Sequence, residues 1–185
     1  MPGKGYDSPM SLRATPSLVI LTGASGAGKT ALAAAVRQQQ IHGCRVLHFD
    51  SIGIPTQLPQ SRHEDQPGRT WQRENTLLWM ARVAAILNAG MSVLFEGQMR
   101  IAFIEEALLG AGISNARILL LDCDDTTRTS RLAVTRSQPH LATTDMMNWG
   151  RYLRREATAA GHEILDTDKL PFDGCLRRLQ SYLIK

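Results

Sequence analysis

Ser17-Leu-Val-Ile-Leu-Thr22 runs directly into Gly23-Ala-Ser-Gly-Ala-Gly28-Lys29-Thr30, and this stretch decides the fold. The first six residues are rich in apolar strand formers. The next eight match the pattern G-x-x-x-x-G-K-[ST] of a phosphate-binding P-loop. Leu32, Ala33 and Val36 then follow at helical spacing. Strand, glycine-rich loop and helix in this order predict a nucleotide site.

The loop chemistry explains why these residue types are needed. Glycines let backbone N–H groups turn toward phosphate oxygens, and the N-terminus of the following helix adds positive potential. Lys29 is expected to reach the β- and γ-phosphates, and the Thr30 hydroxyl is expected to bind Mg²⁺. The predicted ATP-binding residues are therefore Gly23, Ala24, Ser25, Gly26, Ala27, Gly28, Lys29 and Thr30.

The composition is that of one ordinary globular domain. The chain has 185 residues, of which 43% are hydrophobic and 21% charged, and no apolar run approaches the roughly 20 residues of a membrane span. We expect a flexible tail at residues 1–16 and a single domain at 17–185. Three scattered cysteines are too few for a disulfide framework, which favours a reducing cytoplasm.

The positive net charge permits nucleic-acid binding and is explained equally well by a highly anionic small-molecule substrate. The net charge is +4, but aromatic residues make up only 5% of the chain and do not alternate with basic ones as in base-stacking surfaces. The sequence therefore favours ATP and a small acceptor over a nucleic acid and predicts no membrane partner. It leaves open whether the protein is a monomer or a homodimer.

Strand-like and helix-like segments alternate along the whole domain. This alternation predicts an α/β fold with a parallel sheet covered on both faces, whose ligands bind beyond the carboxyl ends of the strands. Strands are expected at 17–22, 45–49, 91–95, 117–121 and 162–165, and helices at 29–40, 71–88, 102–109, 126–136, 145–160 and 173–183.

Carboxylates follow several of these strands. Asp50 is a candidate base that takes the proton of an acceptor hydroxyl or orients that hydroxyl. Glu96 and Asp122 end equally good apolar strands, so either can serve the metal, and Asp50 is a third candidate for its outer shell. We favour Glu96, because Gly97 lets the backbone approach a ligand and Arg100 lies just beyond. His48, within the second strand, is interpreted as a core or near-core histidine.

Arginines gather after the fourth strand. Arg128 and Arg131 share a helix face, and Arg136 lies close to the helix break at Pro139. Arginines supply forked positive charge to a transferring phosphoryl group. Arg131 and Arg136 are therefore candidate catalytic residues, together with Lys29.

These motifs, in this order, resemble the small P-loop kinases of the nucleoside-monophosphate-kinase superfamily, which includes adenylate, shikimate and gluconate kinases and chloramphenicol phosphotransferase. The resemblance implies a three-layer P-loop fold with strand order 2-3-1-4-5, an acceptor-binding insert at about 51–89 and a short lid at about 128–150. The residues that carry it are the P-loop at 23–30, Asp50, Glu96-Gly-Gln-Met-Arg100, Arg128, Arg131 and Asp166-Thr-Asp168.

The resemblance also implies roles for individual residues. Arg128 matches the arginine that packs against adenine, and Thr167 lies in the loop beside adenine. Arg131 and Arg136 match lid arginines that meet the transferring phosphates. Asp50, Gly97 and Arg100 would bind the acceptor, although Glu96 and Met99 replace the Asp and Pro of the adenylate-kinase turn.

The predicted activity is transfer of a phosphoryl group from ATP, with Mg²⁺, to a small metabolite, nucleoside, nucleotide or antibiotic. Two alternatives stay open from the sequence. One is an ATP-binding regulatory module without transfer, and the other is a kinase that acts on nucleic-acid ends.

Overall fold

The computed structural model describes residues 15–41, 43–52 and 68–184 of the chain. Most of the expected tail at 1–16 and most of the segment between residues 51 and 70 lie outside these residues. No helix in the described part of the chain combines the length and the apolar character needed to cross a membrane.

Five strands form one parallel sheet in the order β2-β3-β1-β4-β5, which confirms the predicted topology. The central strand is apolar on both sides, because Leu18 and Ile20 face one core whereas Val19 and Leu21 face the other. The strands are β1 (Leu18–Thr22), β2 (Cys44–His48), β3 (Ser92–Gly97), β4 (Ala116–Asp122) and β5 (Glu163–Asp166).

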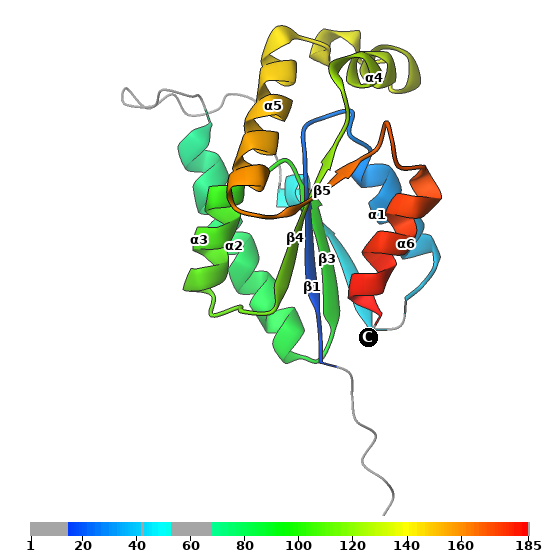
Figure 1. The fold of residues 1–185 in the computed structure, drawn as a ribbon. Coiled ribbons are helices and arrows are strands. Elements are labelled where there is room, and N and C mark those ends of the chain that lie inside the picture. The colour runs from blue at the N-terminus through cyan, green and yellow to red at the C-terminus, as the bar shows by residue number, and fades with distance from the viewer. Residues whose placement is uncertain (1–14, 42, 53–67, 185) are drawn as a thin grey trace, which may run out of the picture.

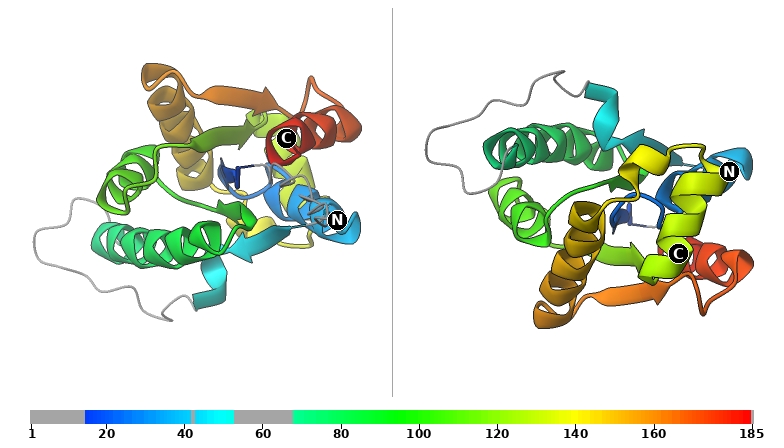
Figure 2. Two further views of the ribbon diagram at one scale, coloured as in Figure 1. Left: turned by 90° about the horizontal axis from the view of Figure 1, so that it is seen from below. Right: turned by 90° about the horizontal axis from the view of Figure 1, so that it is seen from above.

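Helices cover both faces of the sheet (Figures 1 and 2). On one face α1 and α6 pack over Val19 and Leu21, and on the other α2, α3 and α5 enclose the larger aromatic core. The α-helices are α1 (Lys29–Gln38), α2 (Arg69–Asn88), α3 (Ile101–Gly110), α4 (Asp125–Ser130), α5 (Thr144–Ala159) and α6 (Phe172–Leu183), and the short turns are η1 (Phe49–Ile52), η2 (Arg131–Thr135) and η3 (Pro139–Leu141).

The expected helix at 126–136 differs from the observed one. It begins as α4 and then widens into the π-helical turn η2, in which the Arg136 amide bonds to the Arg131 carbonyl at 2.9 Å, five residues back. Because an i→i+5 bond stacks residues five apart, Arg131 and Arg136 lie on the same side of the turn. Apolar periodicity could not reveal this change of helical pitch.

The carboxyl ends of the strands meet at one edge of the sheet. The loop after β1 is the P-loop, η1 follows β2 with Asp50, and Glu96, Asp122 and Asp166 end β3, β4 and β5. Above this edge lie α4 and the N-terminal end of α5 (Figure 1). The predicted site residues are thus brought to one end of the molecule.

Candidate active site

The P-loop backbone adopts conformations that favour glycine. Gly23, Gly26 and Gly28 have φ angles of 152°, 82° and 103°. A Cβ atom on Gly23 would lie 2.2 Å from the Leu121 carbonyl oxygen, so no larger residue fits there. The first turn of α1 has no side-chain cap, which leaves its N–H groups available to an anion.

Three cations hold four successive P-loop carbonyl oxygens, and we call Lys29, Arg128 and Arg131 the carbonyl clamp. Within the loop the Ala27 amide donates to Ala24 O at 3.3 Å, and the other loop amides can face a ligand because the carbonyl oxygens are engaged by the clamp. The contacts are Lys29 Nζ to Ala24 O (3.2 Å), Arg128 Nη1 to Ser25 O (2.8 Å), and Arg131 Nη1 to Gly26 O (3.4 Å) and Ala27 O (3.5 Å).

Arg128 lies beneath the loop, with only 1% of its surface exposed. Its Nη2 donates to Asp122 Oδ1 at 2.5 Å and to the Cys123 carbonyl at 3.1 Å. Gly150 on α5 leaves room for it, since a Cβ there would lie 2.9 Å from Nη2. The resemblance placed Arg128 against adenine. The structure instead gives its guanidinium to a buried carboxylate and to backbone oxygens, out of reach of a base.

Asp122 is engaged at both oxygens. Oδ1 accepts from Arg128, and Oδ2 accepts from Arg154 Nη1 at 2.9 Å. Arg154 also pairs with Asp166 at 2.6 Å. This arrangement leaves Asp122 with its charge already compensated, whereas Glu96 keeps one oxygen without a hydrogen-bond partner among the described residues.

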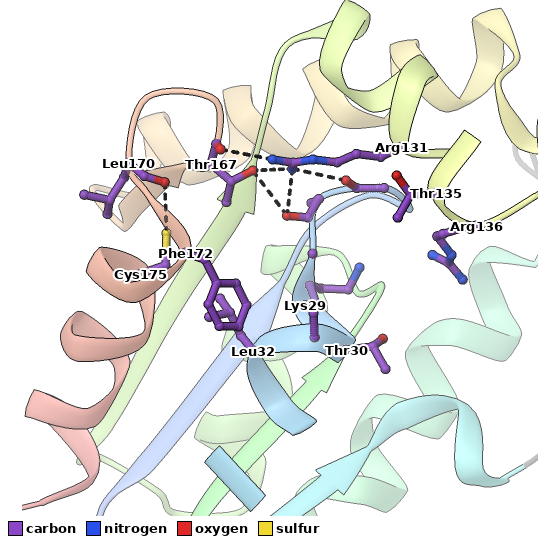
Figure 3. A pocket seen from close by; sticks show the side chains of 14 residues that line it. Lys29, Thr30, Leu32, Arg131, Thr135, Arg136, Thr167, Leu170, Phe172 and Cys175 are labelled. Carbon is purple, nitrogen blue, oxygen red and sulfur yellow. Dashed lines mark hydrogen bonds between the residues drawn. The ribbon is translucent and has the colours of Figure 1, made fainter. Parts of the chain in front are cut away.

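A cavity of about 500 Å³ opens beside the P-loop (Figure 3). Its apolar end is formed by Leu170, Phe172, Cys175 and Leu32, and its polar end by Lys29, Thr30 and Arg136 on the opposite side. An apolar end joined to a polar end that carries Lys29 suits a nucleotide.

The lid arginines enter this cavity differently. Arg131 reaches across the P-loop and donates from Nη1 to Thr167 Oγ1 at 2.6 Å and from Nη2 to the Thr167 carbonyl at 3.0 Å (Figure 3). Arg136 instead lies near Lys29 and helps to lower its pKa. Arg131 therefore lies toward the apolar end of the cavity, and Arg136 toward its polar end.

Lys29 and two carboxylates meet at the polar end. Burial lowers the pKa of Lys29 to about 8, while the charges of Glu96 and Asp50 oppose that shift. Desolvation and the nearby Glu96 charge raise the pKa of Asp50 above its usual value, and Lys29 opposes that rise. The three groups are thus close enough to influence one another, as the sequence predicted for residues at neighbouring strand ends.

His48 was not predicted as a site residue. The β2–β3 register pairs it directly with Glu96, and its Nδ1 lies 2.6 Å from Glu96 Oε1. On its other side, Arg37 Nη2 lies 2.5 Å from His48 Nε2. The signal was present in the sequence, because each residue lies at the carboxyl end of its strand, but the register of the two strands was not known.

Arg100 is also buried, with 7% of its surface exposed. Its guanidinium carbon lies 4.8 Å from the ring centre of Trp149 and 5.5 Å from that of Phe103, and Nη1 donates to Gln72 Oε1 at 2.9 Å. In this position Arg100 joins α2, α3 and α5.

Close packing against Phe49 explains why a glycine stands at position 97. A Cβ on Gly97 would lie 2.3 Å from the Phe49 Cβ, and both residues are buried. The packing of Phe49 against Gly97 explains why no larger residue fits at this position. The acceptor-binding role of Gly97 stays a prediction.

Comparison with known proteins identifies both a family and a fold. Residues 5–108, more than half of the chain, match the family model described as Zeta toxin. Curated protein sequences give no significant match.

Solved structures of P-loop kinases match almost the whole chain. Shikimate kinase from Acinetobacter baumannii in complex with shikimate has 17% sequence identity and a TM-score of 0.58, over 90% of this chain and 92% of that one. The tunicamycin resistance protein of Deinococcus radiodurans has 16% sequence identity and a TM-score of 0.59, over 89% of this chain and 94% of that one. A gluconokinase from Sinorhizobium meliloti 1021 has 13% sequence identity and a TM-score of 0.52, over 92% of this chain and 93% of that one. The chain therefore has the P-loop kinase fold.

Proposed function

The chain belongs to the Zeta toxin family, and we propose that it transfers the γ-phosphoryl group of ATP to a hydroxyl or phosphate of a small molecule. The observation that carries this proposal is the P-loop, whose amides and Lys29 face a cavity of about 500 Å³ with an apolar end for a base. Asp50 and Glu96 lie near the same lysine, where an acceptor would meet the γ-phosphate.

Each residue has a separate task in this reaction. The P-loop amides and Lys29 hold the phosphates, and Arg136 neutralises charge on the transferring group. Arg131 and Thr167 close the base end, where Phe172 and Leu170 offer apolar contact. These roles refine the expectation from the resemblance, in which Arg128 was the base-side arginine.

Asp50 is the proposed base. As the acceptor oxygen bonds to the γ-phosphorus, the bond from that phosphorus to the β,γ-bridging oxygen breaks, ADP leaves, and the hydroxyl proton passes to Asp50. Desolvation and the Glu96 charge raise the pKa of Asp50, which makes it a better proton acceptor than a carboxylate of ordinary pKa.

The donor groups fit Mg²⁺. Thr30 offers a hydroxyl at the start of α1, and Glu96 offers an oxygen without a partner among the described residues. The Glu96 charge raises the pKa of Asp50, a repulsion that a cation would relieve. Bound Mg²⁺ would neutralise charge on the β- and γ-phosphate oxygens. In the described part of the chain, no group of three or more His, Cys, Asp or Glu residues forms a metal cage, and Mg²⁺ bound with phosphates and water needs none.

The deciding experiment follows labelled γ-phosphate from ATP·Mg²⁺ into a mixed pool of metabolites. A labelled product should form with the wild type and fall by roughly 1,000-fold with Asp50→Asn, which keeps the shape and removes the base. Asp145→Asn, on the exposed first turn of α5, is the matched control and should behave as the wild type.

Other outcomes separate the alternatives. ATP binding without any labelled product would favour a regulatory module, and label appearing only in added oligonucleotides would favour action on nucleic-acid ends.

The three cysteines are unpaired, which supports the proposed location in a reducing cytoplasm.

A further inference from the structure

Three side chains from three elements form one line of hydrogen bonds outside the cavity of the nucleotide. Arg37 on α1 reaches His48 on β2, and His48 reaches Glu96 on β3, with distances of 2.5 Å and 2.6 Å. The side chain of His48 is 29% exposed and that of Glu96 is 8% exposed. The line therefore runs from the surface to the buried carboxylate beside Lys29.

The chemistry of Arg37 fixes the state of His48. A guanidinium has only donors, so the Nε2 atom that faces it must present a lone pair. Nδ1 then carries the ring hydrogen, and this N–H group donates a hydrogen bond to Glu96 Oε1. A neutral imidazole in one defined tautomer thus holds one oxygen of the Glu96 carboxylate. The contact with Arg37 on the other side of the ring sets the orientation of the imidazole.

The buried end of the line also has a cation in its neighbourhood, because β3 at Glu96 pairs with β1 at Leu21, just before the P-loop. Lys29 is that cation, which is buried and on which the charge of Glu96 acts. Lys29 nevertheless donates to the Ala24 carbonyl at 3.2 Å and forms no ion pair with Glu96, although the structure describes both side chains. A carboxylate free to rotate in this buried place would be drawn to the ammonium group.

We propose that His48 is a positioning residue that holds Glu96 away from Lys29, so that the lysine stays available to the phosphates of the nucleotide. The proposal rests on the proposed function in that Lys29 must bind phosphate. The other Glu96 oxygen stays open for the role that we assign it near Mg²⁺. His48 does not line the cavity beside the P-loop, so we assign it a positioning role rather than a catalytic one.

The test uses two variants of equal shape. In His48→Asn the side-chain amide can place an N–H group where Nδ1 lies, whereas His48→Leu has the same branching and no donor. ATP binding to the full-length chain is measured by calorimetry without divalent metal, which needs no acceptor. We expect His48→Leu to bind ATP about tenfold more weakly than the wild type, and His48→Asn to stay within about twofold.

A second pair separates positioning from simple damage. In Glu96→Gln, the side chain carries no charge and cannot form an ion pair with Lys29. Adding His48→Leu to that background should then leave ATP affinity unchanged within about twofold, because the interaction that His48 prevents no longer exists. Thermal unfolding of every variant shows whether each is folded at the temperature of the titration.

The outcomes are distinct. The proposal is overturned if His48→Leu binds ATP as tightly as the wild type, if His48→Asn is as weak as His48→Leu, or if the loss persists in the Glu96→Gln background. A wild-type protein that binds no ATP would instead overturn the proposed function. Weaker binding in His48→Leu, normal binding in His48→Asn and no further loss in the Glu96→Gln background together support the positioning role.

Discussion

The two sides of the P-loop are built in different ways. Toward β4 and β5, Arg128, Arg131 and Arg154 are joined to backbone oxygens, to Asp122 or to Thr167 before any nucleotide is present. Toward β2 and β3, Asp50 and Glu96 repel each other beside the buried Lys29. The first side holds its shape by itself, whereas the second carries negative charge that a substrate complex would have to offset. Catalytic sensitivity should therefore concentrate on one side and stability on the other.

Lys29 connects the two sides, and its removal should have the largest effect. Lys29→Met is expected to lower phosphoryl transfer by at least about 1,000-fold, because the charge on the β- and γ-phosphates loses its nearest cation. Stability should not fall, since burial disfavours this charge in the folded protein. Transfer assays and urea unfolding measure the two effects, and a variant with near-normal turnover would contradict the mechanism.

Arg128 should matter mainly to stability. Arg128→Met leaves the Ser25 carbonyl and one oxygen of Asp122 without their donor, so we expect the free energy of unfolding to fall by about 3–5 kcal/mol. Arg100→Met is the matched control on the other side. It should cost about 2 kcal/mol, because the methionine still fills the space between the rings. Equal losses in chemical denaturation would remove the contrast between the two buried arginines.

The pH dependence of stability tests the buried lysine directly. The pKa of Lys29 is about 8 in the folded protein and 10.5 in the unfolded chain. Between these values the unfolded state binds more protons, so the wild type should gain stability as the pH rises, by up to about 3 kcal/mol. The gain is read as the difference between wild type and Lys29→Met across this range. A difference that stays constant with pH would show that Lys29 keeps an ordinary pKa.

Substitution of the two arginines Arg131 and Arg136 should have the smallest effects on kcat and ATP affinity. Arg136→Ala should lower kcat by about 100-fold with little change in ATP affinity, because Arg136 lies at the phosphate end. Arg131→Ala should instead weaken ATP binding by about tenfold, since it opens the clamp on Gly26 and Ala27 and the contact with Thr167. Steady-state kinetics and calorimetry on both variants separate these effects, and the reverse pattern would exchange the two assignments.

The sequence predicted the fold well because its signals are local. The pattern from Ser17 to Thr30 defines a strand, a loop and a helix in adjacent residues, and the later strands are short apolar runs that end in a carboxylate. The observed elements begin and end within one or two residues of those expected, apart from the turn η2. The strand order 2-3-1-4-5 came from the resemblance rather than from the pattern, and it is confirmed.

The roles of single side chains were harder to predict because they depend on contacts across the fold. Arg128 and Arg131 share a helix face, yet one points beneath the P-loop and the other across it. The π turn that brings Arg136 back beside Arg131 has no apolar signature. The role of Gly97 depends on Phe49, and that of His48 depends on strand register, neither of which can be known before the strands are paired.

Gly150 has a consequence for how sequences of this fold can vary. It lies inside α5, where glycine is less favourable than alanine by about 1 kcal/mol, and its missing side chain is the space that Arg128 occupies. The two positions are thus one steric unit, although they are 22 residues apart (150 − 128) on different helices. A larger residue at 150 requires the Arg128 guanidinium to shift or the residue at 128 to become shorter, and the P-loop would then lose a contact to the Ser25 carbonyl.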